Sequence, residues 1–455
     1  MSPPIRAHES SAGGSFFLRA GLLVYQLTLL LVGPLFLLGR FFRGKASPHV
    51  KQRLGIYSGE IRRSLGQFDR PIWIHLVSVG EVLAAQTLIQ ELRRRVPEKN
   101  WVITTVTPTG QEVAQRLIRG PQDQLLYLPW DLGFFVRRCL RSIRPSLFLV
   151  FETEMWPTLF RGLALQGVPI VIVNGRISPT AYRRYLLARP FMERILDQVS
   201  LILAQSPQDA RRFAAIGAPQ DRIAVTGNVK WDVNPEAGSN GHEPAQLRQA
   251  LQLDPGNILW TAGSTHPGEE RLILQIYGRL KARYPALRLL IAPRHPERIP
   301  SIEQEILRVG SRALRRTAIG KEPIQGDHVF LLDTLGELNR FYQVSDLVFV
   351  GGSLVPHGGH NLVEPALFSK PILTGPHLAN FHTMAESLAQ AGGLAIVQSA
   401  EELEKSLSSL IVNPAARAEL GARAHRAIRQ HQGATARTVE LVLLKWLGTE
   451  RSVPK

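Results

Sequence analysis

The sequence contains a single cysteine, Cys139, among its 455 residues. One cysteine excludes an internal disulfide framework and any zinc site built from several cysteines. Three common signatures are also missing: an Asp-x-Asp pair, a GxxxxGK[ST] phosphate loop, and a GxGxxG motif after the first predicted strand. These absences argue against a nucleotide-bound metal, a P-loop enzyme and a dinucleotide cofactor. We therefore expect a protein that works with no metal and no cofactor.

Acidic residues are in the minority. The sequence has 37 Asp and Glu residues and 54 Lys and Arg residues, which gives a formal net charge of +17. Such a balance favours an anionic partner, which is a nucleic acid, an anionic membrane surface or a phosphorylated substrate. A protein that binds nucleic acid would need surfaces on which aromatic and basic side chains alternate. The sequence has none that we recognise, so we expect no nucleic-acid partner.

Charge is absent from Ala20 to Gly39, and about 20 apolar residues suffice to span a membrane. Basic residues follow this run closely, and the positive-inside rule then places the rest of the chain in the cytoplasm. They are Arg40, Arg43, Lys45, Lys51 and Arg53. A cleaved signal peptide is the competing interpretation, but its apolar core would be shorter and its positive charges would precede it. A buried core helix is the other alternative, and the length and terminal position of the run argue against it.

Short apolar runs alternate with helical patterns through the rest of the chain, which is typical of a parallel sheet wound with helices. The alternation pauses at 233–246, where residues typical of a linker gather, and then resumes. We therefore predict two doubly wound α/β domains that face each other across a cleft. The predicted parts are a tail and anchor at 1–46, a first domain at 47–232, a linker at 233–246 and a second domain at 247–455. The last predicted helix is a candidate to fold back on the first domain. The apolar runs are Ile72–Val77, Trp101–Thr105, Ser146–Phe151, Pro169–Asn174, Leu201–Ala204, Ile223–Thr226, Ile258–Ala262, Leu287–Ala292, His328–Leu332, Leu347–Val350 and Pro371–Leu373.

Ligands of open α/β sheets bind beyond the carboxyl ends of the strands, so the residues after each run are the candidates for a site. In the first half these are Gly80, Glu81, Glu152, Glu154 and Lys230. Glu81 is a candidate general base, although a glutamate at a helix start is equally expected as a cap. Glu152 and Glu154 follow a buried strand, where carboxylates are costly unless they are solvated in a cleft or paired. The competing interpretation is a polar rim with no chemical role. Lys230 has an ordinary surface lysine as its competing interpretation.

In the second half, small residues and glycines follow the strand ends, as a nucleotide pocket requires. Ser264 and Thr265 lie where backbone amides at a helix start can bind an anion. The other candidates are Pro293 and Arg294, then Gly336, Glu337 and Leu338, and finally Asn361, Leu362, Val363 and Glu364. A glutamate below a glycine-rich loop can accept both ribose hydroxyls. Each motif alone is more often only a turn.

Together these motifs resemble the transferases of 3-deoxy-D-manno-octulosonic acid (Kdo), which are glycosyltransferases of the two-domain GT-B type. The matching segments are HLVSVGE, TVTPTG, LPWD, FETEMWP, VNGRIS, TGNVKWD, PRHPER and GGHNLVEP. They occur in the family's order between about Arg53 and the last helix. Two small departures, Trp130 and Met155, touch no charged role. The resemblance implies metal-independent, inverting transfer of Kdo from CMP-Kdo to a lipid A precursor, in the synthesis of the lipopolysaccharide inner core at the cytoplasmic face of the bacterial inner membrane.

The resemblance also implies residue roles. Glu81 matches the catalytic base, and Glu152 and Lys230 match residues that stabilise the transition state. The CMP site matches Pro293, Arg294, Gly336–Leu338 and Asn361–Glu364, which makes the second domain the donor domain and the first the acceptor domain. Gly80, Glu154, Ser264 and Thr265 remain candidates for contacts with a phosphate or the acceptor. The alternatives are a GT-B lipid glycosyltransferase that uses a UDP-sugar, and a nucleotide-sugar epimerase on the same fold.

Overall fold

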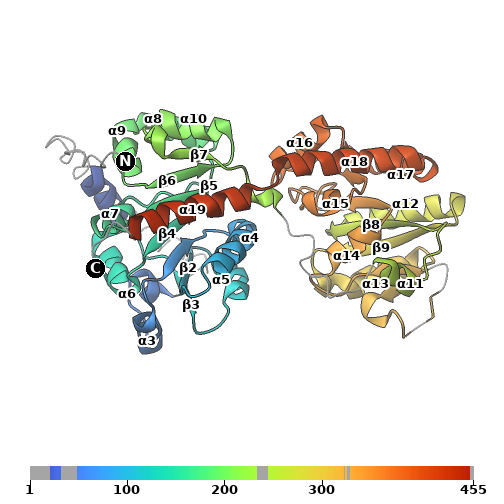
Figure 1. Ribbon diagram of the computed structural model, residues 1–455. Helices are drawn as coiled ribbons and strands as arrows, with labels where there is room; N and C mark the ends of the chain where they lie inside the picture. The colour runs from blue at the N-terminus through green and yellow to red at the C-terminus, as the bar shows by residue number, and fades with distance from the viewer. Residues whose placement is uncertain (1–20, 32–48, 233–243, 322, 325–327, 451–455) are drawn as a thin grey trace. The chain divides into compact units, whose positions relative to one another are not determined.

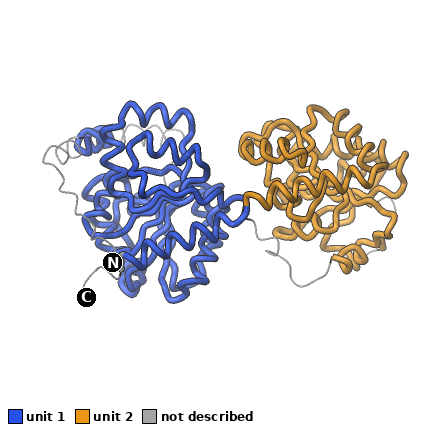
Figure 2. The backbone as a smooth tube through the Cα atoms, turned by 45° about the horizontal axis from the view of Figure 1, so that its top comes forward, with its two compact units in different colours: residues 1–232, 432–455 blue, residues 233–431 orange. Residues whose placement is uncertain are grey.

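The structure is a computed structural model that describes residues 21–31, 49–232, 244–321, 323–324 and 328–450. The chain divides into two compact units, which Figure 2 colours separately. Unit 1 comprises residues 1–232 and 432–455, and unit 2 comprises residues 233–431. The expected second domain ran to residue 455, with the last helix as a candidate to fold back on the first domain; residues 432–455 belong to unit 1.

Unit 1 is built on a seven-stranded, all-parallel sheet in the order β3-β2-β1-β4-β5-β6-β7 (Figure 1). Its strands are β1 Ile72–His75, β2 Trp101–Thr105, β3 Asp123–Tyr127, β4 Leu147–Phe151, β5 Ile170–Gly175, β6 Leu201–Ala204 and β7 Ile223–Val225. Its helices are α2 Val50–Arg53, α3 Gly59–Gln67, α4 Val79–Arg95, α5 Pro108–Ala114, α6 Gly133–Ile143, α7 Pro157–Leu165, α8 Pro179–Leu187, α9 Arg189–Leu196, α10 Pro207–Ala215 and α19 Ala434–Glu450. Three short 3-10 turns are η1 Gln115–Leu117, η2 Gln220–Arg222 and η3 Val229–Trp231.

Unit 2 repeats the architecture with a parallel sheet in the order β10-β11-β9-β8-β12-β13-β14. Its strands are β8 Ile258–Thr265, β9 Leu287–Pro293, β10 Arg312–Arg315, β11 His328–Leu331, β12 Leu347–Val350, β13 Ile372–Thr374 and β14 Leu394–Ile396. Its helices are α11 Pro244–Ala250, α12 Glu269–Arg283, α13 Ile299–Arg308, α14 Leu338–Val344, α15 Val363–Leu367, α16 His382–Gln390, α17 Ala400–Val412 and α18 Pro414–His431, with 3-10 turns η4 Pro296–Arg298 and η5 Arg316–Ala318.

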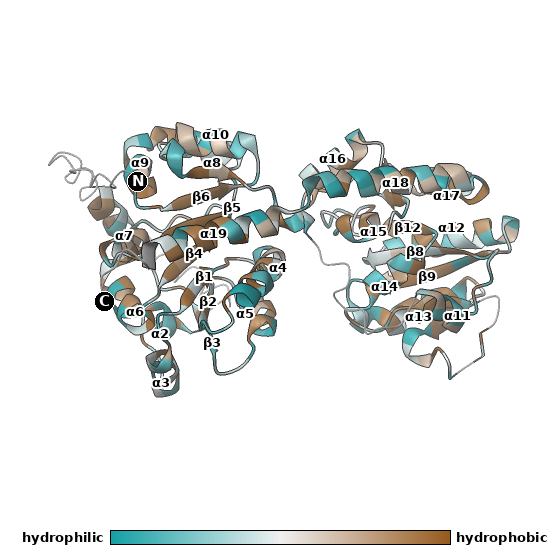
Figure 3. Cartoon of the chain, in the orientation of Figure 1, coloured by the Kyte–Doolittle hydropathy of each residue, from teal (hydrophilic) through white to brown (hydrophobic). Residues whose placement is uncertain are grey.

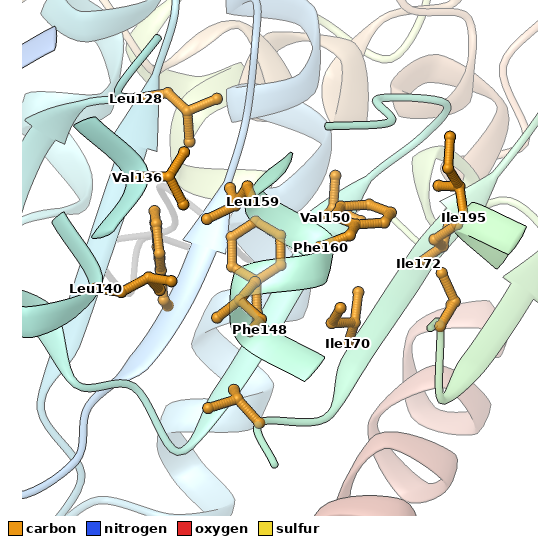
Figure 4. Close-up of a cluster of buried hydrophobic side chains, with 14 of the residues drawn as sticks. Leu128, Val136, Leu140, Phe148, Val150, Leu159, Phe160, Ile170, Ile172 and Ile195 are labelled. Carbon is orange, nitrogen blue, oxygen red and sulfur yellow. The ribbon is translucent and has the colours of Figure 1, made fainter. Parts of the chain in front are cut away.

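The central strands are mostly apolar and buried because helices cover both faces of each sheet. In Figure 3 much of the strand ribbon is accordingly brown, the hydrophobic colour, while many helices mix brown and teal. One face of the unit-1 sheet packs against α6, α7 and α9 through the cluster drawn in Figure 4, which includes Phe148, Phe160 and Ile172. The other face packs against α4 and α19, and Trp446 of α19 is 1% exposed.

The C-terminal helical pattern is broken between α18 and α19. Gly433 has a φ of +88°, a backbone conformation that a glycine adopts without steric cost. The Gly433 amide donates to Asp232 at 2.8 Å, and Arg437 donates to the Thr226 carbonyl at 2.9 Å. Helix α19 is therefore held against the end of the β7–η3 segment, which carries Lys230.

The N-terminal apolar run is only partly described. Residues 21–31 form a helix, and residues 20 and 32–39 of the expected anchor lie outside the described residues, as does most of the expected linker. Leu22 is buried and Gln26 donates to Thr158 at 3.3 Å, while Leu23, Val24, Leu27, Leu30 and Leu31 are 48–72% exposed. Among the helices that the structure describes, none combines the length and the apolar character that a membrane crossing needs.

Candidate functional site

The strand order places the switch point of unit 1 between β1 and β4, which pair in parallel. A switch point is where crossovers leave a sheet in opposite directions, and ligands bind beyond the strand ends there. The segment after β1 leads to Glu81, and the segment after β4 begins with Glu152. Two of the three predicted catalytic residues therefore lie at this switch point.

Glu81 lies in the first turn of α4 and completes a capping box. Its carboxylate accepts from the Val77 amide at 2.9 Å and from the Ser78 hydroxyl at 3.1 Å, while its own amide donates to Ser78 Oγ at 3.4 Å. Burial, and then the negative charges of Glu152 and Glu154, raise its pKa from 4.5 to about 7. The carboxyl group thus combines a structural cap with a pKa suited to a general base at neutral pH.

A second capping box in the chain shows what the cap alone looks like. At the start of α17, Ser399 caps Glu402, whose carboxylate accepts from the Gln398 amide at 2.7 Å. This box lies on an exposed surface, whereas Glu81 is partly buried beside two other carboxylates. The feature that distinguishes Glu81 is therefore its electrostatic surroundings.

Glu152 forms an ion pair with Lys230, whose Nζ lies 2.8 Å from Glu152 Oε1. Their side chains are 16% and 30% exposed, so the pair is partly screened from water. Arg176 lies 3.9 Å from the other carboxylate oxygen. Glu152 has a φ of +58°, which is costly for a non-glycine residue and is typical of functional sites.

Asn174 holds the segment that carries Lys230 in place. This buried residue also has a positive φ, +55°, which asparagine tolerates better than most residues. Its side-chain oxygen accepts from the Val229 amide at 3.1 Å, and Asn228 caps the Lys230 amide at 3.0 Å. These contacts fix the turn η3, and so they position the Lys230 side chain toward Glu152.

Glu154 and Gly80 complete the predicted set in unit 1. Burial, and then the charge of Glu152, raise the pKa of Glu154. Gly80 is exposed in the first turn of α4. The structure thus brings Glu81, Glu152 and Glu154 together with Lys230 as the nearest cation. Arg176 is a member of this group that sequence reasoning missed, although it lies in the VNGRIS segment directly after β5.

The switch point of unit 2 lies between β8 and β12, which also pair in parallel. Here a buried carboxylate occupies the loop amides. Glu269, which is 0% exposed, accepts from the amides of His266, Gly352, Ser353 and Leu354 at 2.7–3.0 Å. Of the expected anion-binding segment, the His266 amide is thus bound by Glu269, and the candidate contacts of Ser264 and Thr265 with an anion stay a prediction.

Ser264 and Thr265 lie at the end of β8 in this arrangement. Ser264 has a φ of +56°. The hydroxyl of the buried Thr265 donates to Glu270 at 2.9 Å, and Glu270 is in turn paired with Arg298 at 2.7 Å. The start of α12 thus carries two buried carboxylates of its own, which compensate its helix dipole.

Several of the residues that were predicted to bind the nucleotide lie close together. Burial raises the pKa of Glu364, and the charge of Arg294, which follows β9, opposes part of this rise. Asn361 donates to Glu364 at 3.1 Å and accepts from the Val363 amide at 3.0 Å. The side chains of Leu362 and Val363 are fully buried, so these residues can offer a ligand only their main chain. Pro293 is also buried, at the end of β9.

Glu337 has a separate set of partners. It accepts from Arg316 at 3.1 Å, from Arg340 at 3.0 Å and from the Thr334 hydroxyl. Gly336 before it has a φ of +85°, and Leu338 begins α14. The Glu337 carboxylate is thus paired with two guanidinium groups, and its main-chain carbonyl accepts from the Arg340 amide at 2.9 Å.

Four histidines after strand ends of unit 2 were missed as a group by sequence reasoning: His266, His295, His357 and His360. The ring centroids of the other three lie 4.1–5.7 Å from the ring centroid of His266. A cavity of about 830 Å³ lies beside them, lined by His357, Gly358, Leu378 and Asn380 among others. None of the predicted nucleotide residues lines this cavity. Within the described ranges, no three His, Cys, Asp or Glu side chains are grouped so as to hold a metal ion.

Comparison with known proteins connects this geometry to a family. The family model described as "3-Deoxy-D-manno-octulosonic-acid transferase (kdotransferase)" matches residues 48–233. A 3-deoxy-D-manno-octulosonic acid transferase of Haemophilus influenzae is 35% identical over 419 residues, which cover 92% of this chain and 97% of the relative. A transferase of the same name from Bordetella pertussis is 34% identical over 390 residues, covering 83% and 88%.

Among solved structures, a UDP-GlcNAc 2-epimerase from Neisseria meningitidis superposes with a TM-score of 0.52 at 12% identity, covering 83% of this chain and all of that one. At this identity the likeness shows the fold alone, namely two parallel-sheet α/β domains as expected. The sequence relatives carry the assignment, because the match extends over nearly their whole length. The chain therefore belongs to the 3-deoxy-D-manno-octulosonic acid transferase family.

Proposed function

We propose that this protein transfers Kdo from CMP-Kdo to a lipid A precursor, without a metal and with inversion at the anomeric carbon. The observation that carries the mechanism is Glu81, whose carboxyl group has a pKa of about 7 beside the Glu152–Lys230 ion pair. In a member of this transferase family, such a group is suited to take the proton of an attacking hydroxyl.

In the proposed step, the acceptor hydroxyl attacks the anomeric carbon of Kdo while Glu81 takes its proton. The bond from that carbon to the phosphate oxygen breaks, and CMP leaves with the electron pair. Attack from the face opposite the leaving group inverts the configuration. Lys230, held by Glu152 at 2.8 Å, supplies a fixed positive charge for the negative charge that develops in the transition state.

We assign the donor nucleotide to unit 2. Glu364 lies at the start of α15, where a carboxylate can accept both ribose hydroxyls, and Arg294 can pair with a phosphate oxygen. Gly336, Glu337 and Leu338 offer main-chain groups to the base, as do Leu362 and Val363. The proposal that no metal assists rests on the sequence, which has no Asp-x-Asp pair.

We further propose that the chain is attached to the bacterial inner membrane through Ala20–Gly39, with its globular units in the cytoplasm. Two observations support this attachment. The exposed leucines of the helix 21–31 would be unfavourable in water unless a lipid surface covers them. The net charge of +17 favours an anionic lipid surface and a phosphorylated lipid acceptor.

The decisive experiment is mass spectrometry of a lipid A precursor after incubation with CMP-Kdo and the purified full-length enzyme. A mass increase of one or more Kdo units, which persists with EDTA, is the expected result. Protection from thermal unfolding by CMP but not by UDP would distinguish the proposed Kdo transferase from a UDP-sugar transferase or an epimerase. A product formed from a UDP-sugar, with none from CMP-Kdo, would overturn the proposal.

A further inference from the structure

The histidine cluster of unit 2 contains a directly hydrogen-bonded pair. Nε2 of His266 lies 2.8 Å from Nε2 of His360, and the two rings are nearly parallel. His266 follows β8, and His360 belongs to the glycine-rich segment after β12, so both lie at the switch point of the sheet. A Cβ atom on Gly352 would lie 2.9 Å from the His360 ring, so the pair needs a glycine at this position.

The pair itself is largely buried, whereas its neighbours are exposed. His266 is 8% exposed and His360 is partly exposed, while His295, His357 and Arg294 are exposed. His357 stacks on His266 with ring centroids 4.1 Å apart, and His295 meets the same ring edge-on at 5.7 Å. Two further imidazoles therefore contact His266, and Arg294 lies near enough for its charge to act on both rings of the pair.

The charges that face the pair are mainly positive. Arg294 makes no ion pair within the described part of the chain, whereas Arg298 is paired with Glu270. His295 lies 3.3 Å from Glu297. Glu269 is saturated by four backbone amides, and Glu364 accepts from Asn361. Neither of these two carboxylates is hydrogen-bonded to the imidazole pair.

Burial and these neighbouring cations lower the pKa of both His266 and His360 to about 4. The pair is consequently neutral at physiological pH, with one Nε2–H donating to the other Nε2. An oxyanion brought close to it would raise these pKa values, because an opposite charge favours the protonated ring. A single added proton preserves the hydrogen bond, whereas two would place two N–H groups against each other.

We propose that the His266–His360 pair binds an oxyanion at the anomeric centre of the donor and takes up one proton from solvent as it does so. This inference rests on the proposed function, because the anomeric carbon of CMP-Kdo carries both a phosphate ester and a carboxylate. Arg294 adds a permanent positive charge beside the pair. The positive charge of the protonated pair is therefore present only while the donor is bound.

The test is isothermal titration calorimetry of the full-length enzyme in two non-phosphate buffers of different ionisation enthalpy, from pH 6 to 8. The ligands are CMP, CMP-Kdo without acceptor, and cytidine. The difference in heat between the buffers gives the protons taken up. A phosphate monoester ionises near pH ~6 itself, but this contribution is common to all variants and cancels in their difference.

We expect the wild type to take up nearly one proton more than His360→Gln or His266→Gln. Its affinity should rise as the pH falls, by up to about tenfold per pH unit, which is the limit for one linked proton. The exposed His49→Gln, in unit 1, should behave as wild type, and cytidine should show no uptake. Uptake with CMP identifies the phosphate as the anion, and uptake with CMP-Kdo alone identifies the carboxylate. If His266→Gln does not fold, the partly exposed His360 carries the test.

Equal proton counts for wild type and variants, in an enzyme that binds CMP and transfers Kdo, would overturn this inference and leave the proposed function intact. An enzyme that neither binds CMP nor transfers Kdo would remove the proposed function, and this inference with it. A purely structural role for the pair would change thermal stability in the variants but would leave no difference in proton uptake.

Discussion

Replacing Glu81 by Gln separates a catalytic role from a structural one, because the two roles predict opposite results. Glutamine is also suited to the third position of a capping box, so it can keep the contacts to Val77 and Ser78. It cannot take a proton from an attacking hydroxyl. We therefore expect turnover to fall by about 10²–10⁴-fold, the usual contribution of general base catalysis.

The thermal stability of Glu81→Gln should increase at alkaline pH, in contrast to its turnover. A rise of the Glu81 pKa from 4.5 to about 7 means that the folded protein favours the protonated carboxyl. The stability from this group is full below pH 4.5 and is lost as the pH rises through about 7. At about 1.4 kcal/mol per pH unit, the loss amounts to about 3 kcal/mol. Glu81→Gln should therefore unfold at a higher temperature than the wild type at pH 8, and at nearly the same temperature at pH 4.

The pH dependence of the wild type provides a second readout. Because the base must be deprotonated, kcat/KM should rise with pH through about 7 and level off above it. Glu154→Gln removes a nearby negative charge that raises the Glu81 pKa, so this variant should move the rise to lower pH. The assay is transfer of Kdo to a lipid A precursor at substrate concentrations well below KM, where the rate reports kcat/KM, followed by mass spectrometry.

Glu402→Gln is the matched control, since it alters an equivalent capping box at the start of α17. It should leave turnover unchanged. If folded Glu81→Gln enzyme instead transfers Kdo at nearly the wild-type rate, Glu81 is only a cap. The base would then have to be sought at Glu152 or Glu154.

Four further predictions follow from the same structure. Glu364→Ala should weaken CMP-Kdo binding in calorimetry while the exposed control Glu419→Ala does not, and equal donor affinity would exclude Glu364 from the site. Glu269→Ala strands four buried amide donors, so thermal unfolding should show a loss of at least about 3 kcal/mol. Kdo transfer should survive EDTA, and loss that Mg²⁺ or Mn²⁺ restores would refute metal independence. A C-terminal reporter enzyme should be active only in the cytoplasm, and activity in the periplasm would reverse the proposed orientation.

The sequence predicted the central strands well and the edge strands poorly. Eleven apolar runs coincide with strands, because a parallel strand buried on both faces reads as a continuous apolar segment. The missed strands are β3, β10 and β14, each at or near the margin of its sheet. Strand β10, with the sequence RALR, buries only Leu314, so its residues carry no apolar pattern. Edge strands are held by their neighbours, and this information is absent from their own composition.

The site shows the same division between local and long-range information. Glu81, Glu152 and Lys230 could be proposed because each follows a strand end, and the sheet then brings strand ends together. That rule says which residues reach the edge but not which of them bind one another there. The loop amides after β8 and β12 are occupied by Glu269, and His266 meets His360 across 94 positions of sequence. Both contacts depend on the adjacency of β8 and β12, two strands separated in the chain by the whole β9–β11 segment. Only the strand order therefore shows that the His266–His360 pair and the Glu269 contacts form where β8 and β12 lie side by side.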